Sequence, residues 1–160
     1  MRVLWSKLKT WLRPRTRWKR ISGLVAALGW RGVVKYLIER RPRERGSVFS
    51  VHPRLSMHPL FIRHGTSDLQ VFDQIFVECE YRCLDDLTQV ELIIDCGANV
   101  GYSSAYFLSR FPNSRIVAVE PDPENFEMLS RNLAPYGRRV NLVHAGIWSH
   151  ATRLGFVDEP

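Results

Sequence analysis

The stretch of the chain best suited to hold a ligand is IIDCGANVGYSS, residues 93–104. Gly97 and Gly101 let the backbone turn sharply and approach a ligand closely, because neither carries a side chain. An apolar, β-branched run precedes them. The run that follows is helix-like, and the first backbone N–H groups of a helix have no partner within it. Glycines also serve simply to turn a strand into a helix, so the stretch alone leaves both interpretations open.

An acidic residue further along the chain favours a nucleoside-containing ligand. Glu120 ends the next apolar run, 25 residues after Asp95, and a carboxylate there accepts hydrogen bonds from a ribose diol. The dinucleotide fingerprint G-x-G-x-x-G fails, because Asn99 and Tyr102 stand at its second and third glycine positions. Asp95 adds a negative charge that repels phosphate and tolerates a cation. S-adenosylmethionine, a sulfonium without phosphate, therefore fits better than NAD, although an NAD-type dinucleotide-binding oxidoreductase stays an alternative.

The segments around these residues alternate between strand-like and helix-like patterns. Strands are predicted at residues 91–95, 115–120 and 140–145, and helices at 103–111 and 123–133. Asp122 followed by Pro123 is typical of a helix start, and Gly137 of a helix end. This alternation predicts an α/β fold with a parallel sheet and right-handed crossovers. Ligands bind such sheets beyond the carboxyl ends of the strands, where Gly97 and Glu120 lie.

Charge divides the chain into two parts. Residues 1–45 hold 14 Lys and Arg against 2 Glu, a net charge of +12, whereas the rest of the chain carries −5. The stretch RRPRERGS is typical of a linker. We therefore predict a basic amphipathic helical arm with its linker at residues 1–46, and a domain at residues 47–160. Within that domain, HPLFIRHGTSDLQVF predicts a strand, a turn and a helix, with the capping-box residues Ser67 and Gln70.

The basic arm has the apolar spacing of two amphipathic helices. Their predicted apolar residues are Leu4, Trp5, Leu8, Trp11 and Leu12 in the first, and Trp30, Val33, Val34, Leu37 and Ile38 in the second. The longest apolar run, ISGLVAALGW, ends at Arg31. It is shorter than the roughly 20 residues that cross a bilayer, so we expect no spanning helix.

Basic faces with tryptophans suit an anionic membrane surface and, less well, nucleic acid. A helical arm that simply packs on the domain is an equal alternative. The predicted location is the cytoplasm, with peripheral attachment to the membrane left open. A noncatalytic protein that binds membrane or nucleic acid through this arm is a further alternative to an enzyme.

Three stretches together resemble the FkbM-type family of S-adenosylmethionine-dependent methyltransferases. DCGANVG resembles the cofactor loop D-x-G-A-N-x-G of that family, and VAVEPDPENFEMLSRNL resembles the segment that follows it. HGTSDLQVFDQIFVECEY resembles the region ahead of the first core strand, so the resemblance covers residues 59–156. It implies a Rossmann-like class I methyltransferase fold with helices on both faces of the sheet. It also implies S-adenosyl-L-methionine as cofactor and a small-molecule or glycan acceptor, because family members O-methylate sugars and secondary metabolites.

The resemblance also assigns site residues. It places the loop around the methionine part of the cofactor, Glu120 on the ribose hydroxyls, and two further segments around adenine. The matched positions are Asp95, Cys96, Gly97, Asn99 and Gly101 in the loop, Glu120, Pro121 and Asp122 after the second strand, and Ala145, Gly146 and Ile147 after the third. His144 and His150 match no catalytic role, so the catalytic residue stays unassigned. No metal site is expected.

The family pattern continues with a fourth core strand and with segments that form much of the acceptor pocket. The sequence ends at Pro160, so the resemblance covers about the first half of that pattern and we expect a truncated domain without activity of its own. In the strand order of the family, 3-2-1-4-5-7-6, the strand at residues 91–95 is central. Without a fourth strand it becomes an edge, which favours association with another chain.

Overall fold

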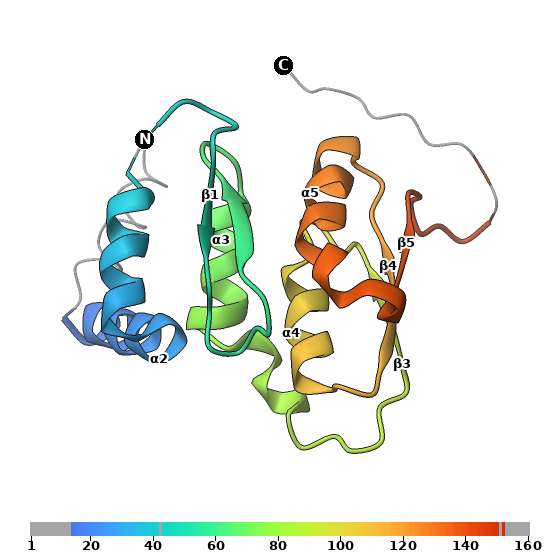
Figure 1. The fold of residues 1–160 in the computed structure, drawn as a ribbon, viewed down its shortest axis with the longest axis horizontal. Coiled ribbons are helices and arrows are strands. Elements are labelled where there is room, and N and C mark those ends of the chain that lie inside the picture. Colours follow the sequence, from blue (N-terminus) through green and yellow to red (C-terminus); the bar gives the residue numbers. More distant parts are fainter. Residues whose placement is uncertain (1–13, 42, 151, 153–160) are drawn as a thin grey trace. The chain divides into compact units, whose positions relative to one another are not determined.

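The computed structural model describes residues 14–41, 43–150 and 152. Its contacts separate into two compact units, Met1–Thr88 and Gln89–Pro160 (Figure 1). Helix α2 (Pro14–Glu39) belongs to the first unit, because it packs against strand β1 (Val48–Val51) and against a helical turn, Asp73–Val77. The predicted division into residues 1–46 and 47–160 thus does not follow the packing. The packing does not test whether residues 1–46 and 47–160 are separate domains in related proteins, so that division stays a prediction.

Helix α2 changes direction at Gly29, whose φ of 66° and ψ of 167° are not helical. Glycine adopts such a conformation without the steric cost that other residues meet. The core-facing residues of α2 are Leu24, Ala27, Leu28, Val33 and Tyr36. The apolar residues predicted for the second helix of the arm do lie on α2, where Val33 is buried and the other four are exposed. The first predicted helix lies outside the described residues.

By length and composition alone, the segment Arg20–Glu39 of α2 is a candidate to cross a membrane. One such helix is weak evidence, because a core helix of a soluble protein or a signal sequence meets the same criteria. The expectation of no spanning helix stays a prediction.

Strands β1 and β2 (Leu60–Arg63) pair antiparallel, with Val48 opposite Arg63 and Val51 opposite Leu60. Helix α3 (Asp68–Phe72) follows β2 and runs directly into the π-helical turn Asp73–Val77. The strand, turn and helix predicted in this region are confirmed. Strand β1 was not predicted, because its four residues are too few to give a periodic signal. The core here consists of the buried side chains Phe49, Val51, Leu60, Ile62, Phe72, Ile75 and Phe76.

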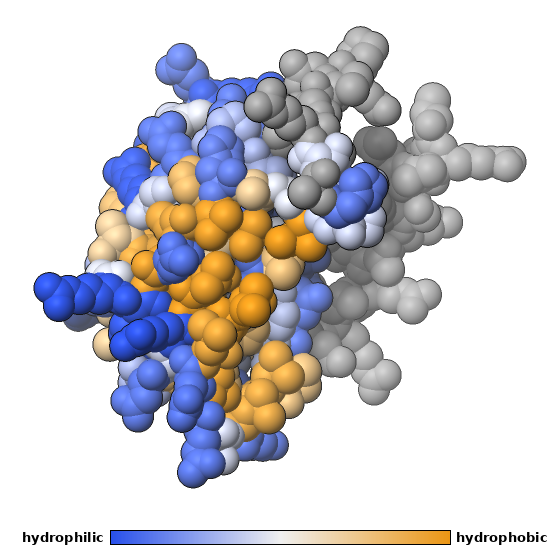
Figure 2. Space-filling view, turned by 90° about the vertical axis from the view of Figure 1, so that its right-hand side faces the viewer, coloured by the Kyte–Doolittle hydropathy of each residue, from blue (hydrophilic) through white to orange (hydrophobic). Residues whose placement is uncertain are grey.

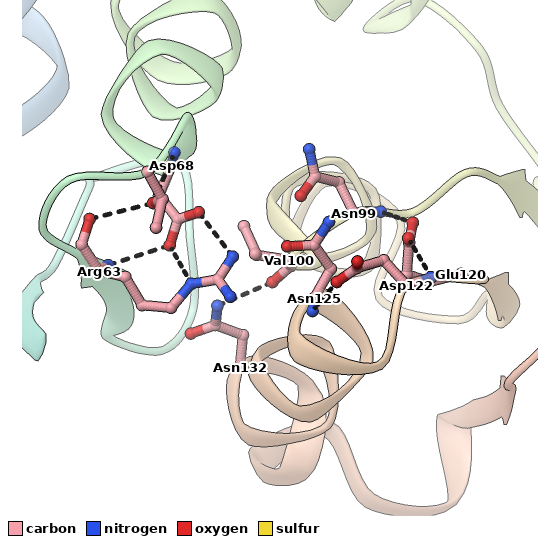
Figure 3. Close-up of polar contacts among 9 residues, drawn as sticks. Arg63, Asp68, Asn99, Val100, Glu120, Asp122, Asn125 and Asn132 are labelled. Carbon is pink, nitrogen blue, oxygen red and sulfur yellow. Dashed lines mark hydrogen bonds and ion pairs between the residues drawn. The ribbon is translucent and has the colours of Figure 1, made fainter. Parts of the chain in front are cut away.

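A buried ion pair joins β2 to α3. The Arg63 guanidinium donates from Nε to Oδ2 of Asp68 at 3.0 Å and from Nη2 to Oδ1 at 2.9 Å, and the Arg63 backbone N–H also donates to Oδ2, at 3.0 Å (Figure 3). The predicted capping box is wrong, because the Ser67 side chain makes no capping hydrogen bond. The hydroxyl of Thr66 accepts from the Asp68 backbone N–H instead, at 3.2 Å.

A second buried carboxylate fastens α2 to the π-helical turn. Asp73 accepts a hydrogen bond from the Tyr36 hydroxyl at 2.7 Å and forms an ion pair with Arg20. Burial, with the nearby carboxylate adding to it, raises the pKa of Tyr36 well above its usual value. The phenol therefore stays protonated and remains the donor to Asp73 across the physiological pH range.

The second unit is built on a three-stranded parallel sheet. Its strands, in the order β3-β4-β5, are β3 (Leu92–Cys96), β4 (Arg115–Val119) and β5 (Val140–Val143). The crossover helices are α4 (Tyr102–Arg110) and α5 (Pro123–Leu133), and a 3-10 helix, Ala134–Arg139, follows α5. This arrangement confirms the predicted Rossmann-like α/β class and all five predicted elements. Strand β3 begins and ends one residue later than predicted, and β4 and β5 end one and two residues before their predicted ends.

Both crossover helices lie on the same side of the sheet, where α4 packs against β3, β4 and α5 (Figure 1). Two right-handed crossovers that step in the same direction along a sheet must place their helices on one face. Helices were expected on both faces of the sheet. Among the described residues, helices cover only one of its faces. On the strand β3, Leu92 and Ile94 are 59% and 63% exposed, and Figure 2 shows a broad apolar area on the side of the molecule formed by the strands.

The exposed edge strand leads to a first prediction. Within the described residues β3 pairs only with β4, and its free edge carries apolar residues without a bulge or proline. We expect the 160-residue polypeptide to self-associate at micromolar concentrations, because unpaired N–H and C=O groups beside exposed apolar side chains favour strand addition. Replacing Ile94 by lysine should weaken this association by about tenfold or more in sedimentation velocity.

Leu87→Lys is the matched control, since Leu87 is a similarly exposed leucine outside the sheet. It should leave the association unchanged. A monomer with a sharp, cooperative melt at micromolar concentration would contradict the expectation.

Candidate functional site

The carboxyl ends of the three parallel strands meet at one edge of the sheet. Cys96 lies opposite Val119, and Val119 lies opposite Val143. The segments that follow the strands, residues 97–101, 120–122 and 144–147, therefore begin side by side. The sequence-predicted site residues are thus brought together by the sheet itself.

Residues 97–101, here called the glycine loop, have a backbone shaped by three left-handed residues. The φ angles are 84° at Gly97, 50° at Asn99 and 86° at Gly101. The N–H groups of Gly97 and Ala98 both donate to the carbonyl oxygen of Val119, each at 2.9 Å. The loop is therefore fastened to the end of β4.

The two glycines of the loop have different surroundings. A Cβ at Gly101 would stand 2.8 Å from a methyl carbon of Leu129, so this glycine allows α5 to pack closely. A Cβ at Gly97 would meet no atom within 4 Å. Gly97 therefore leaves open space at the carboxyl end of β3, which is the place that the sequence predicted for close approach of a ligand.

Glu120 accepts hydrogen bonds that hold the glycine loop in place. Its side chain is 6% exposed, Oε2 accepts from the Asn99 N–H at 2.8 Å, and Oε1 accepts from the Asp122 N–H at 2.9 Å (Figure 3). An ionised carboxylate has about four acceptor positions, so two remain for ligand hydroxyls. Glu120 thus joins two of the predicted segments and keeps the capacity to bind a diol.

Asp95 has partners that the sequence analysis missed. Its Oδ2 accepts from the hydroxyls of Ser103, at 2.7 Å, and Ser104, at 2.6 Å. Both serines lie in the first turn of α4, so the carboxylate at the end of β3 also orients the start of this helix. The signal was the pair of serines at the start of the predicted helix, whose hydroxyls can donate to a carboxylate at the end of the preceding strand.

One polar atom of the glycine loop is buried without a partner. Among the described residues, Oδ1 of Asn99 makes no hydrogen bond. Such an acceptor is costly unless something donates to it. This atom therefore offers a ready position for a ligand donor.

Asp122 and His144 shape the second and third segments. The Asp122 carboxylate caps α5 by accepting from the Asn125 N–H at 2.8 Å, as the sequence predicted. His144 stacks on Phe126 at 4.6 Å, and its Nε2 lies 3.0 Å from the carbonyl oxygen of Pro121. These contacts hold the His144 ring against Phe126 and the segment that follows β4.

The side chains of the third predicted segment, residues 145–147, are exposed to solvent. Strand β5 ends at Val143, two residues before the predicted end, and the residues that follow it are all exposed. These residues are His144, Ala145, Gly146, Ile147 and Trp148. The side chain of Trp148 is 61% exposed.

The charge of the site is negative. Asp95, Glu120 and Asp122 follow one another around the ends of β3 and β4, and no Lys or Arg occurs in residues 95–104 or 120–125. A site of this kind attracts a cation and repels phosphate groups. Within the part of the chain that the structure describes, no cluster of His, Cys, Asp or Glu could hold a metal ion.

Fold and site together define a parallel α/β unit with a glycine loop and a cluster of acidic residues at the carboxyl ends of its strands. No protein-family model matches the chain. It is 38% identical over 69 residues to ribosomal RNA small subunit methyltransferase H from Streptomyces avermitilis, covering 40% of this chain and 22% of that protein. It is also 38% identical over 66 residues to methyltransferase sdnD from Sordaria araneosa, covering 40% and 24%. The chain thus spans about a quarter of the length of these curated relatives.

Among solved structures, an S-adenosylmethionine-dependent methyltransferase from Agrobacterium tumefaciens is similar, with a TM-score of 0.49 and 10% identity. The match covers 65% of this chain and 34% of that chain.

Proposed function

We propose that the second unit binds S-adenosyl-L-methionine and serves methyl transfer. The observation that carries the proposal is the glycine loop held by the buried Glu120 carboxylate, in a site whose charge is negative throughout. A sulfonium and an ammonium are cations that such a site attracts, whereas the phosphates of NAD are repelled. The two curated relatives, both named methyltransferases, support the same class.

The residues fit the cofactor by three features. Gly97 leaves open space at the end of β3, the unpartnered Oδ1 of Asn99 can accept from a ligand N–H, and Glu120 keeps acceptor positions for the ribose hydroxyls. Asp95 and Cys96 at the end of β3, with Gly101 of the glycine loop, complete the site around the methionine part. Beside adenine we place Pro121, Asp122, Ala145, Gly146 and Ile147. When bound, the cofactor supplies an electrophilic methyl group.

We propose an oxygen of a small molecule or glycan as the methyl acceptor, as the resemblance to the FkbM-type family implies. The protein must then hold the acceptor oxygen near the methyl group and remove its proton. None of the described residues of the site is assigned that second task. RNA is the second candidate acceptor, because one relative is named a ribosomal RNA methyltransferase.

The acceptor is tested with the protein isolated from its source cells and methyl-tritiated S-adenosylmethionine. Separate pools of small molecules, glycans and total RNA from the same cells serve as acceptors. Label in the small-molecule or glycan pool is the expected result, and label in RNA alone would establish the second candidate. A protein that neither binds the cofactor nor labels any pool would favour the noncatalytic alternative.

A further inference from the structure

Helix α2 carries an exposed apolar stripe on the side away from the core of its unit. The stripe consists of Trp30, Val34, Leu37 and Ile38, which are 70%, 57%, 46% and 49% exposed. Their spacing of four, seven and eight residues places them on one face of a helix. Val33 and Tyr36, on another face of the same helix, are buried in the first unit. The helix is therefore held on the protein while it presents large apolar side chains outward.

The stripe is bordered by basic residues. Arg31 and Lys35 lie one position after Trp30 and Val34, and both are exposed. Residues 30–45 hold six Lys and Arg against two Glu, a net charge of +4. One of the two acidic residues, Glu39, is already paired with Arg43 at 3.1 Å. The surroundings of the stripe are thus positively charged.

We propose that this face of α2 docks on an anionic lipid surface and carries the protein at the membrane. Tryptophan and aliphatic side chains enter the boundary between headgroups and acyl chains, while lysine and arginine at the border contact acidic headgroups. The positive border complements a negative membrane surface. The proposal rests on α2 alone and does not depend on the proposed function of the second unit.

The geometry of α2 favours a helix that lies on the membrane over one that spans it. The apolar segment Arg20–Glu39 is interrupted by the break at Gly29, and Arg31 and Lys35 fall in its second half. Several of its apolar residues, including Leu24, are committed to the core of the first unit. A spanning orientation would remove them from that core.

Vesicle flotation of the full chain tests the proposal, because bound protein rises with the vesicles while self-associated protein sinks. We expect flotation with vesicles that contain phosphatidylserine and none with pure phosphatidylcholine. Raising the salt from about 0.05 M to about 0.5 M should release the protein, since screening weakens the attraction of exposed charges.

Two sets of variants separate the contributions. Arg31→Gln with Lys35→Gln should lower the partition coefficient about 30-fold, and Val34→Ser with Leu37→Ser about tenfold. The matched control is Leu55→Ser with Leu87→Ser, which removes two exposed leucines outside α2. It should leave the partition coefficient unchanged.

Four results would overturn the proposal. Three are the absence of flotation, equal flotation with neutral and acidic vesicles, and an equal loss in the control pair. The fourth is binding that resists high salt, which would indicate insertion of α2 across the bilayer.

Discussion

Replacing Gly97 by valine is expected to abolish binding of S-adenosylmethionine while leaving the helical content of the chain nearly intact. Gly97 has a φ of +84° and open space around its Cβ position. A β-branched side chain would fill that space at the carboxyl end of β3, where we propose that the backbone approaches the cofactor. It would also strain the backbone, at a cost of about 1–3 kcal/mol. Calorimetric titration gives the affinity, and circular dichroism gives the helical content.

Gly46→Val is the matched control for strain. Gly46 has a φ of +83°, and its Cβ position is also open, but it lies in the first unit. The two variants should lose similar free energy of unfolding, whereas only the change at Gly97 should remove cofactor binding. If Gly97→Val retains affinity within about threefold, the backbone does not approach the cofactor there.

Replacing Glu120 by alanine is expected to weaken cofactor binding by about 30-fold to 1000-fold, which corresponds to about 2–4 kcal/mol. The variant loses the acceptor that we propose for the ribose hydroxyls. It also leaves the N–H groups of Asn99 and Asp122 without their carboxylate, so the glycine loop is no longer held in the bound shape. Affinity and free energy of unfolding should therefore fall together, measured by calorimetry and by chemical denaturation.

Arg139→Ala separates lost binding from lost stability in the same unit. Arg139 donates to the carbonyl oxygens of Leu108, Phe111 and Ser114, away from the carboxyl ends of the strands. Its removal should lower the free energy of unfolding and leave the cofactor affinity within about threefold. A change of less than about threefold in Glu120→Ala would remove Glu120 from the site.

Local sequence signals predicted the second unit well. Its strands are apolar runs bounded by polar residues, and the pair Asp122 and Pro123 marked the first residue of α5 correctly. The meeting of the glycine loop with Glu120 followed from topology alone, because parallel strands place their carboxyl ends at one edge. The general position of the site was therefore predictable without any contact information.

The contacts within the site were not predictable in the same way. The hydrogen bond from the Asn99 N–H to Glu120 joins residues 21 positions apart, and no periodic pattern reports it. The same holds for the two serine hydroxyls on Asp95. That Gly101 also makes room for Leu129 of α5 was likewise not predicted. Such assignments depend on the packing of side chains between elements.

The sequence predicted the apolar residues of the second half of α2, but not which of them are buried. Periodicity identifies which residues share a face, but it does not say whether that face meets the core or the exterior. The break at Gly29 changes the direction of the helix, and Tyr36 turns inward to reach Asp73. The stripe that contains Trp30 is left exposed as a result.

Parallel calorimetric titrations of the chain with S-adenosylmethionine and with NAD test the central claim most directly. They are made below the concentration at which the polypeptide self-associates. We expect one molecule of S-adenosylmethionine to bind per chain, and NAD to bind at least about tenfold more weakly, because Asp95, Glu120 and Asp122 repel its phosphates. Tighter binding of NAD, or no binding of S-adenosylmethionine to a chain shown to be folded, would contradict the account.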